Sequence, residues 1–185
     1  PNIDPGFYKA LNETYGKELT PEEIFYYIYA VLYSNTYRSR YAEFLKIGFP
    51  RVPFTKDHAL FGRLAALGGE LVNLHLLKSP VLDSPIAKFP IAGDNKVEKP
   101  SYSDGRVSIN KTQHFDGVEK DVWEYQVGGY QVCSKWLKDR KGRILTLDDI
   151  KHYCRVVTAL SKTIDIQAEI DRLYDGVERS LIELG

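Results

Sequence analysis

Apolar residues near the start of the chain recur at the spacing of a helix. The clearest run covers residues 24–32 and follows TPEE, in which Thr20 is expected to cap the helix and Glu23 to complete a capping box. A shorter helix is expected before it, over residues 5–15, with Gly16 at its end. The chain therefore begins with two predicted helices.

Two further helices are predicted before residue 78. The first is capped by Asn35 or Thr36 and stops before FPRVPF, residues 49–54, because each proline pushes its predecessor out of the helical region. Thr55 is expected to cap the second, which contains Gly68-Gly69. A glycine inside a helix costs about 1 kcal/mol relative to alanine, so this pair predicts a close helix crossing.

The pattern changes over residues 79–127, where proline, glycine, aspartate and asparagine interrupt short alternating runs. Three of these runs predict strands: KVEKPSY at 96–102, RVSIN at 106–110 and DVWEYQV at 121–127. The sequence SDG at 103–105 predicts a tight turn between the first two. The middle of the chain is therefore predicted to form a small antiparallel sheet.

Helical spacing returns in GGYQVCSKWLKDRKGR, residues 128–143, whose two glycines are expected to turn the chain out of the sheet. TLDD at 146–149 is expected to cap a long last helix, whose apolar register shifts near Asp165. The predicted class is α+β, with helical N-terminal and C-terminal parts that flank the sheet. One domain is expected, in three parts: 1–78, 79–127 and 128–185.

Composition narrows the kind of protein. With 185 residues, 43% of them hydrophobic, the chain is large enough for one core of ordinary size. It begins with Pro1 and contains no methionine, so we expect a piece of a longer multidomain polypeptide. Cys133 and Cys154 have no paired spacing, which indicates buried thiols in a reducing compartment. No signal peptide or membrane-length apolar run is visible, so a cytoplasmic protein without membrane contact is expected.

The sequence lacks recognisable catalytic motifs. None of the four histidines is spaced from cysteine or carboxylate as in a metal site, and no nucleophile elbow, phosphate loop or dinucleotide fingerprint occurs. Asp148 and Asp149 could be imagined as a metal pair, but their place at a helix start favours capping. We therefore expect no catalytic, cofactor-binding or metal-binding residue, and no enzyme activity from this segment alone.

Charge is uneven although the formal net charge is zero. Residues 135–143 contain five cations against Asp139 alone, a net charge of +4, and residues 38–63 contain six cations against two acids, also +4. Such clusters suit DNA phosphates, which supply most non-specific affinity. The other interpretation is a solvated helix end, with cations facing the helix dipole and with Asp139 and Arg140 in internal ion pairs or caps.

A second polar group lies between Asp104 and Asp121. Arginine and lysine suit guanine, whereas asparagine and glutamine suit adenine, so this stretch could read base edges. The same residues would equally suit the solvent face of a strand. The candidates are Arg106, Asn110, Lys111, Gln113 and His114.

Five motifs in order carry a family resemblance: TPEEIFYYIYAVLYSNTYRSRYAEFL, FPRVPF, LGGELVNLHLL, GGYQVCSKWLKDRKGR and LTLDDIKHYCRVVTALSKTI. Over residues 1–169 the chain resembles the C-terminal specificity region, the target recognition domain, of type ISP restriction–modification enzymes and related adenine-N6 DNA methyltransferases. In that family one polypeptide joins a nuclease, an ATPase motor, a methyltransferase and this region. The resemblance implies double-stranded DNA and the methyltransferase domain of the same polypeptide as partners.

The resemblance also limits what this segment can do. The methyltransferase tetrapeptide, the S-adenosylmethionine loop and the ATPase motifs are absent, so S-adenosylmethionine, ATP and Mg are expected only in other domains of the parent enzyme. A rival hypothesis is a scaffold that docks the methyltransferase onto the motor without reading bases. The predicted phosphate contacts, from the shared motifs and the basic clusters, are Arg38, Arg51, Lys135, Lys138, Arg140, Lys141 and Arg143.

Overall fold

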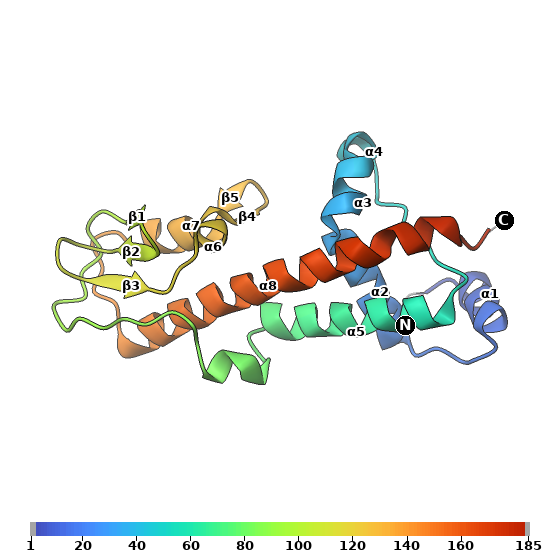
Figure 1. Ribbon diagram of the computed structural model, residues 1–185, viewed down its shortest axis with the longest axis horizontal. Coiled ribbons are helices and arrows are strands. Elements are labelled where there is room, and N and C mark those ends of the chain that lie inside the picture. Colours follow the sequence, from blue (N-terminus) through green and yellow to red (C-terminus); the bar gives the residue numbers. More distant parts are fainter. Residues whose placement is uncertain (1–2, 184–185) are drawn as a thin grey trace. The chain divides into compact units, whose positions relative to one another are not determined.

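The computed structural model describes residues 3–183 (Figure 1). Its contacts divide the chain into two compact units. We call the first the helical unit, Pro1–Asn73 with Asp165–Gly185, and the second the mixed unit, Leu74–Ile164. These units do not coincide with the three predicted parts, because both ends of the chain belong to the helical unit. The second boundary falls beside Asp165, where the apolar register shifts.

The α+β class is confirmed, because helices accompany a three-stranded and a two-stranded antiparallel sheet. In the helical unit the helices are α1 (Pro5–Tyr15), α2 (Pro21–Tyr33), α3 (Asn35–Arg40), α4 (Ala42–Ile47), most of α5 (His58–His75) and the C-terminal part of α8 (Leu147–Arg179). Those of the mixed unit include η1 (Pro80–Asp83), α6 (Lys120–Glu124) and α7 (Val132–Lys138). Its strands are β1 (Ser101–Ser103), β2 (Arg106–Ser108), β3 (His114–Asp116), β4 (Gln126–Val127) and β5 (Tyr130–Gln131).

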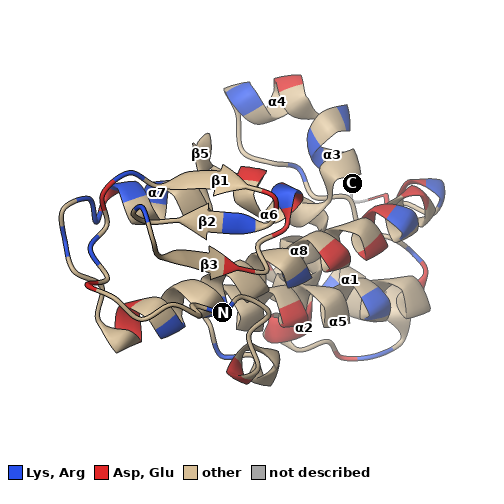
Figure 2. Ribbon diagram, turned by 60° about the vertical axis from the view of Figure 1, so that its left-hand side comes forward, with Lys and Arg blue, Asp and Glu red and all other residues tan. Residues whose placement is uncertain are grey.

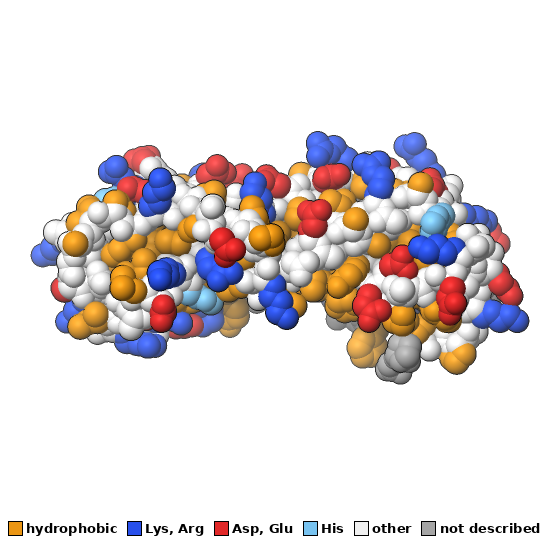
Figure 3. All heavy atoms as spheres, turned by 90° about the horizontal axis from the view of Figure 1, so that it is seen from below, with side chains coloured by type: hydrophobic (Ala, Val, Ile, Leu, Met, Phe, Trp, Pro, Cys, Tyr) orange, Lys and Arg blue, Asp and Glu red, His pale blue; other side chains and the backbone are white. Residues whose placement is uncertain are grey.

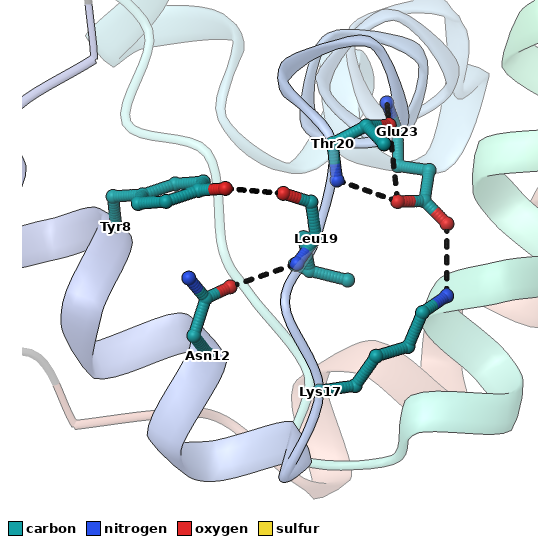
Figure 4. Close-up of polar contacts among 6 residues, drawn as sticks. All are labelled: Tyr8, Asn12, Lys17, Leu19, Thr20 and Glu23. Atoms are coloured by element: carbon teal, nitrogen blue, oxygen red, sulfur yellow. Dashed lines mark hydrogen bonds and ion pairs between the residues drawn. The ribbon is translucent and has the colours of Figure 1, made fainter.

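The first predicted helix boundaries are confirmed (Figure 4). Gly16 ends α1 in the left-handed region, with φ 61°. The backbone N–H of Thr20 donates to Glu23 Oε2 at 2.7 Å, and the backbone N–H of Glu23 donates to Thr20 Oγ1 at 3.1 Å. The loop between them is held by α1, since Asn12 Oδ1 accepts from the backbone N–H of Leu19 at 3.0 Å.

Two predicted caps are wrong. Ser34, and not Asn35 or Thr36, caps α3, because its hydroxyl accepts from the backbone N–H of Tyr37 at 3.1 Å. The expected single helix is also broken at Tyr41 into α3 and α4. Asp57, and not the predicted Thr55, caps α5, because its carboxylate accepts hydrogen bonds from the backbone N–H groups of Ala59 and Leu60.

Aromatic packing and one close helix crossing hold the helical unit. Tyr27 is fully buried and stacks on Phe54 and on Phe61, each with ring centroids 4.8 Å apart. A Cβ atom on Gly68 would lie 1.8 Å from the carbonyl oxygen of Tyr26, so only glycine lets α5 approach α2 this closely. The crossing predicted from the glycine pair is therefore confirmed.

The mixed unit is built on the sheet β1-β2-β3. Asp104 and Gly105, with φ 48° and 79°, make the predicted tight turn between β1 and β2. The inner face of the sheet packs on α7 and α8, where the ring centroids of Phe115 and Tyr153 are 4.4 Å apart. Figure 1 shows these strands beside the N-terminal half of α8.

One predicted strand is wrong. Residues 121–127 form most of α6 and then the short strand β4, and the third strand of the sheet is β3, in a stretch where no strand was predicted. Val122 is buried in the core while its neighbour Trp123 stacks on Tyr102, with centroids 5.6 Å apart. Adjacent residues of a strand point to opposite faces, whereas a helical turn lets both side chains pack inward.

Two glycines behave differently from their prediction. Gly128 and Gly129 were expected to lead the chain out of the sheet, but they form the turn of the β4–β5 hairpin, with φ 58° and 82°. Both conformations favour glycine because a Cβ atom would strain the left-handed backbone. Among the described residues, no helix has the length and apolarity needed to cross a membrane.

Candidate nucleic-acid interface

The basic stretch after α7 is attached to a segment far from it in sequence. The backbone N–H of Gly142 donates to the carbonyl of Val97 at 2.7 Å, and the N–H of Val97 donates to the carbonyl of Arg143 at 2.9 Å. The N–H of Leu145 donates to the carbonyl of Asn95 at 2.9 Å. We call residues 138–143 the basic loop; these bonds fix its end against residues 95–97.

The turn after β2 is attached to the same segment. Gln113 Oε1 accepts from the backbone N–H of Asn95 at 2.8 Å, and Gln113 Nε2 donates to Asn95 Oδ1 at 2.7 Å. Asn110 Nδ2 donates to the carbonyl of Lys96 at 3.1 Å. Residues 110–113 and the basic loop therefore meet on residues 95–97, which serve as a clamp between them.

This arrangement collects exposed cations at one end of the mixed unit. Lys111 extends from the turn, Lys138, Lys141 and Arg143 from the basic loop, and Lys96 from the clamp itself. Figure 2 shows the cationic positions along the loop that follows α7. Lys96 was not among the predicted contacts, although it lies next to buried Val97 in a predicted strand, where alternation directs its side chain outward.

Arg140 is held inside this cluster. Its guanidinium lies 3.6 Å from the ring centroid of Trp136, Nη1 donates to the carbonyl of the same residue at 3.1 Å, and Nε lies 3.8 Å from Asp149 Oδ1. Only 25% of its side chain is exposed. This geometry is the internal ion pair that was the other interpretation of Arg140. The charge of Arg140 is therefore less available to a ligand than the charge of Lys138.

Lys135 lies one turn earlier on α7. Its Nζ is 2.8 Å from Asp139 Oδ2 and 5.5 Å from the ring centroid of Tyr130. The hydrogen bond to Asp139 and its negative charge raise the pKa of the Lys135 ammonium. Because the pair is exposed to solvent, it stabilises the helix only weakly and can open for a phosphate.

Gln113 has a structural role. It is only 1% exposed, and besides its bonds to Asn95 its amide donates to the carbonyl of Ile91 at 3.0 Å. Asn110 accepts from the backbone N–H of Gln113 at 2.7 Å and is likewise occupied. We therefore leave Gln113 and Asn110 out of the candidate interface, because their polar atoms shape the turn that presents Lys111.

The outer side of the sheet presents two of the predicted base-reading residues. Arg106 Nε donates to Asp116 Oδ1 at 2.9 Å, and His114 Nε2 lies 3.2 Å from the same oxygen. Arg106 is exposed, and an exposed ion pair is worth only about 0–1 kcal/mol, so it can exchange Asp116 for a ligand. His114 is half-buried beside it.

Arg38 and Arg51 belong to the helical unit. Both side chains are exposed, and the hydroxyl of Tyr37, the residue before Arg38, donates to the carbonyl of Arg51 at 3.0 Å. Arg40 pairs with Asp175 and Glu178, whereas Arg38 and Arg51 form no ion pair with a described acid. These two residues are treated separately from the cluster of the mixed unit.

The face drawn in Figure 3 is not dominated by one sign of charge. On the face drawn in Figure 3, cationic and anionic side chains alternate with apolar ones. Within residues 3–183, no three His, Cys, Asp or Glu side chains are grouped to hold a metal ion. Burial raises the pKa of Cys133 to about 12 and that of Cys154 to about 11, so neither thiol is poised as a nucleophile at neutral pH.

The mixed unit thus presents exposed cations from three segments and an arginine on the outer face of its sheet, and a basic patch is the first feature expected of a nucleic-acid-binding module. Comparison with protein families places the chain more closely. The family described as the type ISP C-terminal specificity domain matches residues 1–169. The chain belongs to this family, and the resemblance seen in its motifs is confirmed.

Solved structures share the fold. A cryo-EM structure of a DrdV–DNA complex is 26% identical with a TM-score of 0.71, and the match covers 91% of this chain and 20% of that chain. A nuclease-deletion mutant of the type ISP restriction–modification enzyme LlaGI, in complex with a DNA substrate mimic, is 22% identical with a TM-score of 0.61, covering 83% and 14%. The ATP-dependent type ISP enzyme LlaBIII bound to DNA is 19% identical with a TM-score of 0.61, covering 95% and 12%.

The chain thus spans 12 to 20% of the length of these structures. At their level of identity, the two type ISP enzymes LlaGI and LlaBIII show the fold alone. A comparison with curated proteins found no match.

Proposed function

We propose that this chain recognises the DNA target of a type ISP restriction–modification enzyme and holds double-stranded DNA for methylation or cleavage by other domains. The observation that carries the proposal is the clamp at residues 95–97, on which the basic loop and the 110–113 turn meet. Family membership and DNA-bound structures of similar fold support the same role.

The exposure and chemistry of the side chains separate the proposed phosphate contacts from the proposed base contacts. Lys96, Lys138, Lys141 and Arg143 contact phosphates, which position the duplex without reading its sequence. On the neighbouring sheet and turn, the base-reading candidates are Arg106, Lys111 and His114. An arginine or lysine that reaches guanine O6 and N7 contributes about 1–3 kcal/mol of discrimination between bases.

Catalysis is assigned to other parts of the parent polypeptide. An adenine-N6 methyltransferase in the same polypeptide would flip the target adenine out of the duplex that this chain holds. S-adenosylmethionine, ATP and Mg would bind in those other parts. A cytoplasmic location belongs to the proposal, and it agrees with the two free cysteines.

The test is binding of the 185-residue chain to a random-sequence duplex at several salt concentrations, measured by fluorescence anisotropy. A Lys138→Ala/Lys141→Ala variant should bind more weakly to every duplex. If each lysine contacts one phosphate, the slope of log affinity against log salt should fall by about 1.8.

A Lys9→Ala/Lys120→Ala variant is the matched control. It removes the same formal charge from two exposed lysines that pair with Glu13 and Glu124 on α1 and α6. An equal loss of slope in both variants would mean that only net charge matters, and the clamp would not be the interface. Salt-independent binding, or none at low salt, would instead favour the scaffold hypothesis.

A further inference from the structure

The segment from α4 into the following loop exposes three large apolar side chains. The exposed fractions of Phe44, Ile47 and Phe49 are 69%, 85% and 98%. In Figure 1, α3 and α4 rise away from the other helices of the helical unit. A cluster of this kind on a water-soluble surface marks a site of interaction, whereas single exposed apolar residues are ordinary.

The packing of α4 points the same way. The helix has six residues, none of them buried, and no side chain caps its N-terminus. Isolated helices shorter than about 12–15 residues are marginal in water, so a helix normally depends on packing one face against a core. The exposed face of α4 lacks that support within the described chain, and a partner would supply it.

A groove lies beside this helix. Its walls are formed by Tyr37, Tyr41, Phe44, Phe49, Pro50 and Pro53, with Arg51 also lining it. The hydroxyls of Tyr37 and Tyr41 are bound to the carbonyl of Arg51 and to Glu178, so the tyrosines offer mainly ring surface. An apolar groove with a cation beside it suits an apolar anchor side chain flanked by a carboxylate.

We propose that this groove binds a protein segment from the remainder of the type ISP polypeptide, with an apolar anchor at Phe44–Phe49 and an acid facing Arg51. The inference rests on the proposed function, because it takes the chain as one part of such a polypeptide. The matched segment makes up only 12 to 20% of the related chains, so most of each relative is available to cover it.

Two other occupants fit less well. In a symmetric pair of this chain the groove of one copy would face the groove of the other, which would bring the unpaired Arg51 of both copies together. Like charges brought together in this way are unfavourable. A duplex would place phosphates against Phe44 and Ile47, which offer them no hydrogen bond, and would leave the apolar groove unfilled.

The experiment uses a thiol reporter in an Ile47→Cys variant. Both native cysteines are buried with raised pKa values, so maleimide should label the reporter selectively. The labelling rate is compared between the 185-residue chain and the complete polypeptide, without DNA, by mass spectrometry of the peptide that contains position 47. A covered groove should slow labelling by about 10-fold or more, because the thiol then reacts only through local opening.

A Lys99→Cys variant is the control, since Lys99 is also exposed but lies in the mixed unit. Slow labelling of the complete polypeptide at position 47 and not at position 99 supports the inference. Equal rates at position 47 in the two proteins overturn it. So does protection that depends on chain concentration, which would indicate a second copy, or protection that requires DNA.

The outcome is independent of the proposed function. Protection at position 47 is measured without DNA, whereas DNA recognition is tested by the salt dependence of the basic loop. Protection together with salt-independent DNA binding would preserve the docking site and remove the recognition role. The converse result would preserve recognition and remove the docking site.

Discussion

Different interactions stabilise the two units. The helical unit relies on helices with continuous apolar faces and on ring stacking around Tyr27. The mixed unit has strands of two or three residues, and much of its outer part is held by side chains that bond to backbone, as Gln113 and Asn110 do. We therefore expect the helical unit to tolerate changes on its surface, whereas the mixed unit depends on a few polar residues.

The difference also separates the two kinds of candidate surface. In the mixed unit, the clamp leaves cations exposed on short loops, where polar contacts and not helix packing fix the backbone. In the helical unit, the unusual surface is an apolar groove beside α4. Ionic recognition and apolar docking are thus assigned to structures that would respond differently to salt and to mutation.

The largest expected effect concerns the helix crossing. Gly68→Ala would place a Cβ atom 1.8 Å from the carbonyl oxygen of Tyr26, which is backbone and cannot move alone. We expect the free energy of unfolding to fall by about 3 kcal/mol, at the upper end for overpacking. Gly62→Ala on the same helix meets nothing within 4 Å and should raise it by about 0.5–1 kcal/mol. Urea denaturation measures both, and equal effects would contradict the close crossing.

The next effect tests the polar design of the mixed unit. Gln113→Ala leaves the N–H of Asn95 and the carbonyl of Ile91 without a partner, so stability should fall by about 2–3 kcal/mol. Hydrogen exchange should localise the loss to the mixed unit. Lys111 is exposed, so Lys111→Ala should leave stability unchanged while altering the preference among DNA sequences. A change of sequence preference by Gln113→Ala without any loss of stability would return Gln113 to the interface.

A smaller effect distinguishes free from internally bound cations. Lys138→Ala should reduce the salt slope of DNA binding by about one, because a phosphate contact is lost. Arg140→Ala should change that slope less and lower stability by about 1–2 kcal/mol, since it removes the cation over the Trp136 ring and the ion pair with Asp149, whose bonds to Thr146 remain. Thermal denaturation and titrations at three salt concentrations compare the two. Equal slopes for both variants would show that Arg140 also reaches DNA.

The smallest effect compares one helix cap from each unit. Hydrogen bonds from the backbone N–H of Thr20 and Thr146 hold the pKa values of Glu23 and Asp149 below their ordinary values. Because the folded-state pKa is lowered, the unfolded chain binds a proton at a higher pH than the folded chain does as the pH falls. The stabilisation is therefore present above the ordinary carboxylate pKa near 4 and is lost as pH falls through the folded-state pKa.

Thr146→Ala and Thr20→Ala should each remove about 1 kcal/mol at neutral pH, a usual value for an N-cap. Each variant keeps the backbone N–H bond but loses the threonine hydroxyl that donates to the same carboxylate, so it should lose slightly less stability than the parent chain when the pH is lowered from 6 to 3. Guanidinium denaturation at both pH values checks this. A parallel loss in parent and variants would mean that the hydroxyl bonds to these carboxylates do not contribute to the acid sensitivity.

Sequence reasoning succeeded where structure is local. The capping box at Thr20, the left-handed Gly16 and the glycine crossing at Gly68 follow from contacts within a few residues or from steric rules that hold anywhere. The caps at Ser34 and Asp57 were misplaced by one or a few residues, because neighbouring Ser, Asn, Thr and Asp side chains all can accept the same backbone hydrogen bonds.

The candidate site was only partly visible for a different reason. Local charge identified the basic loop, but its pairing with residues 95–97 spans more than 40 positions and leaves no periodic signal. Gln113 is of a residue type that can read bases, and only the hydrogen-bond partners that bury it reveal its structural role. Alternation in residues 121–127 likewise could not predict that Trp123 would stack on Tyr102.

The clamp has a consequence for how such a domain could be re-engineered. Its contacts to the basic loop use only main-chain atoms, and Gly142, with φ 82°, is the position there that requires a particular residue. Its contacts to the 110–113 turn use the side chains of Asn95, Asn110 and Gln113. The exposed positions of the loop could therefore be exchanged if Gly142 and the partly buried Arg140 are kept, whereas a transplanted turn would have to bring its amide partners with it.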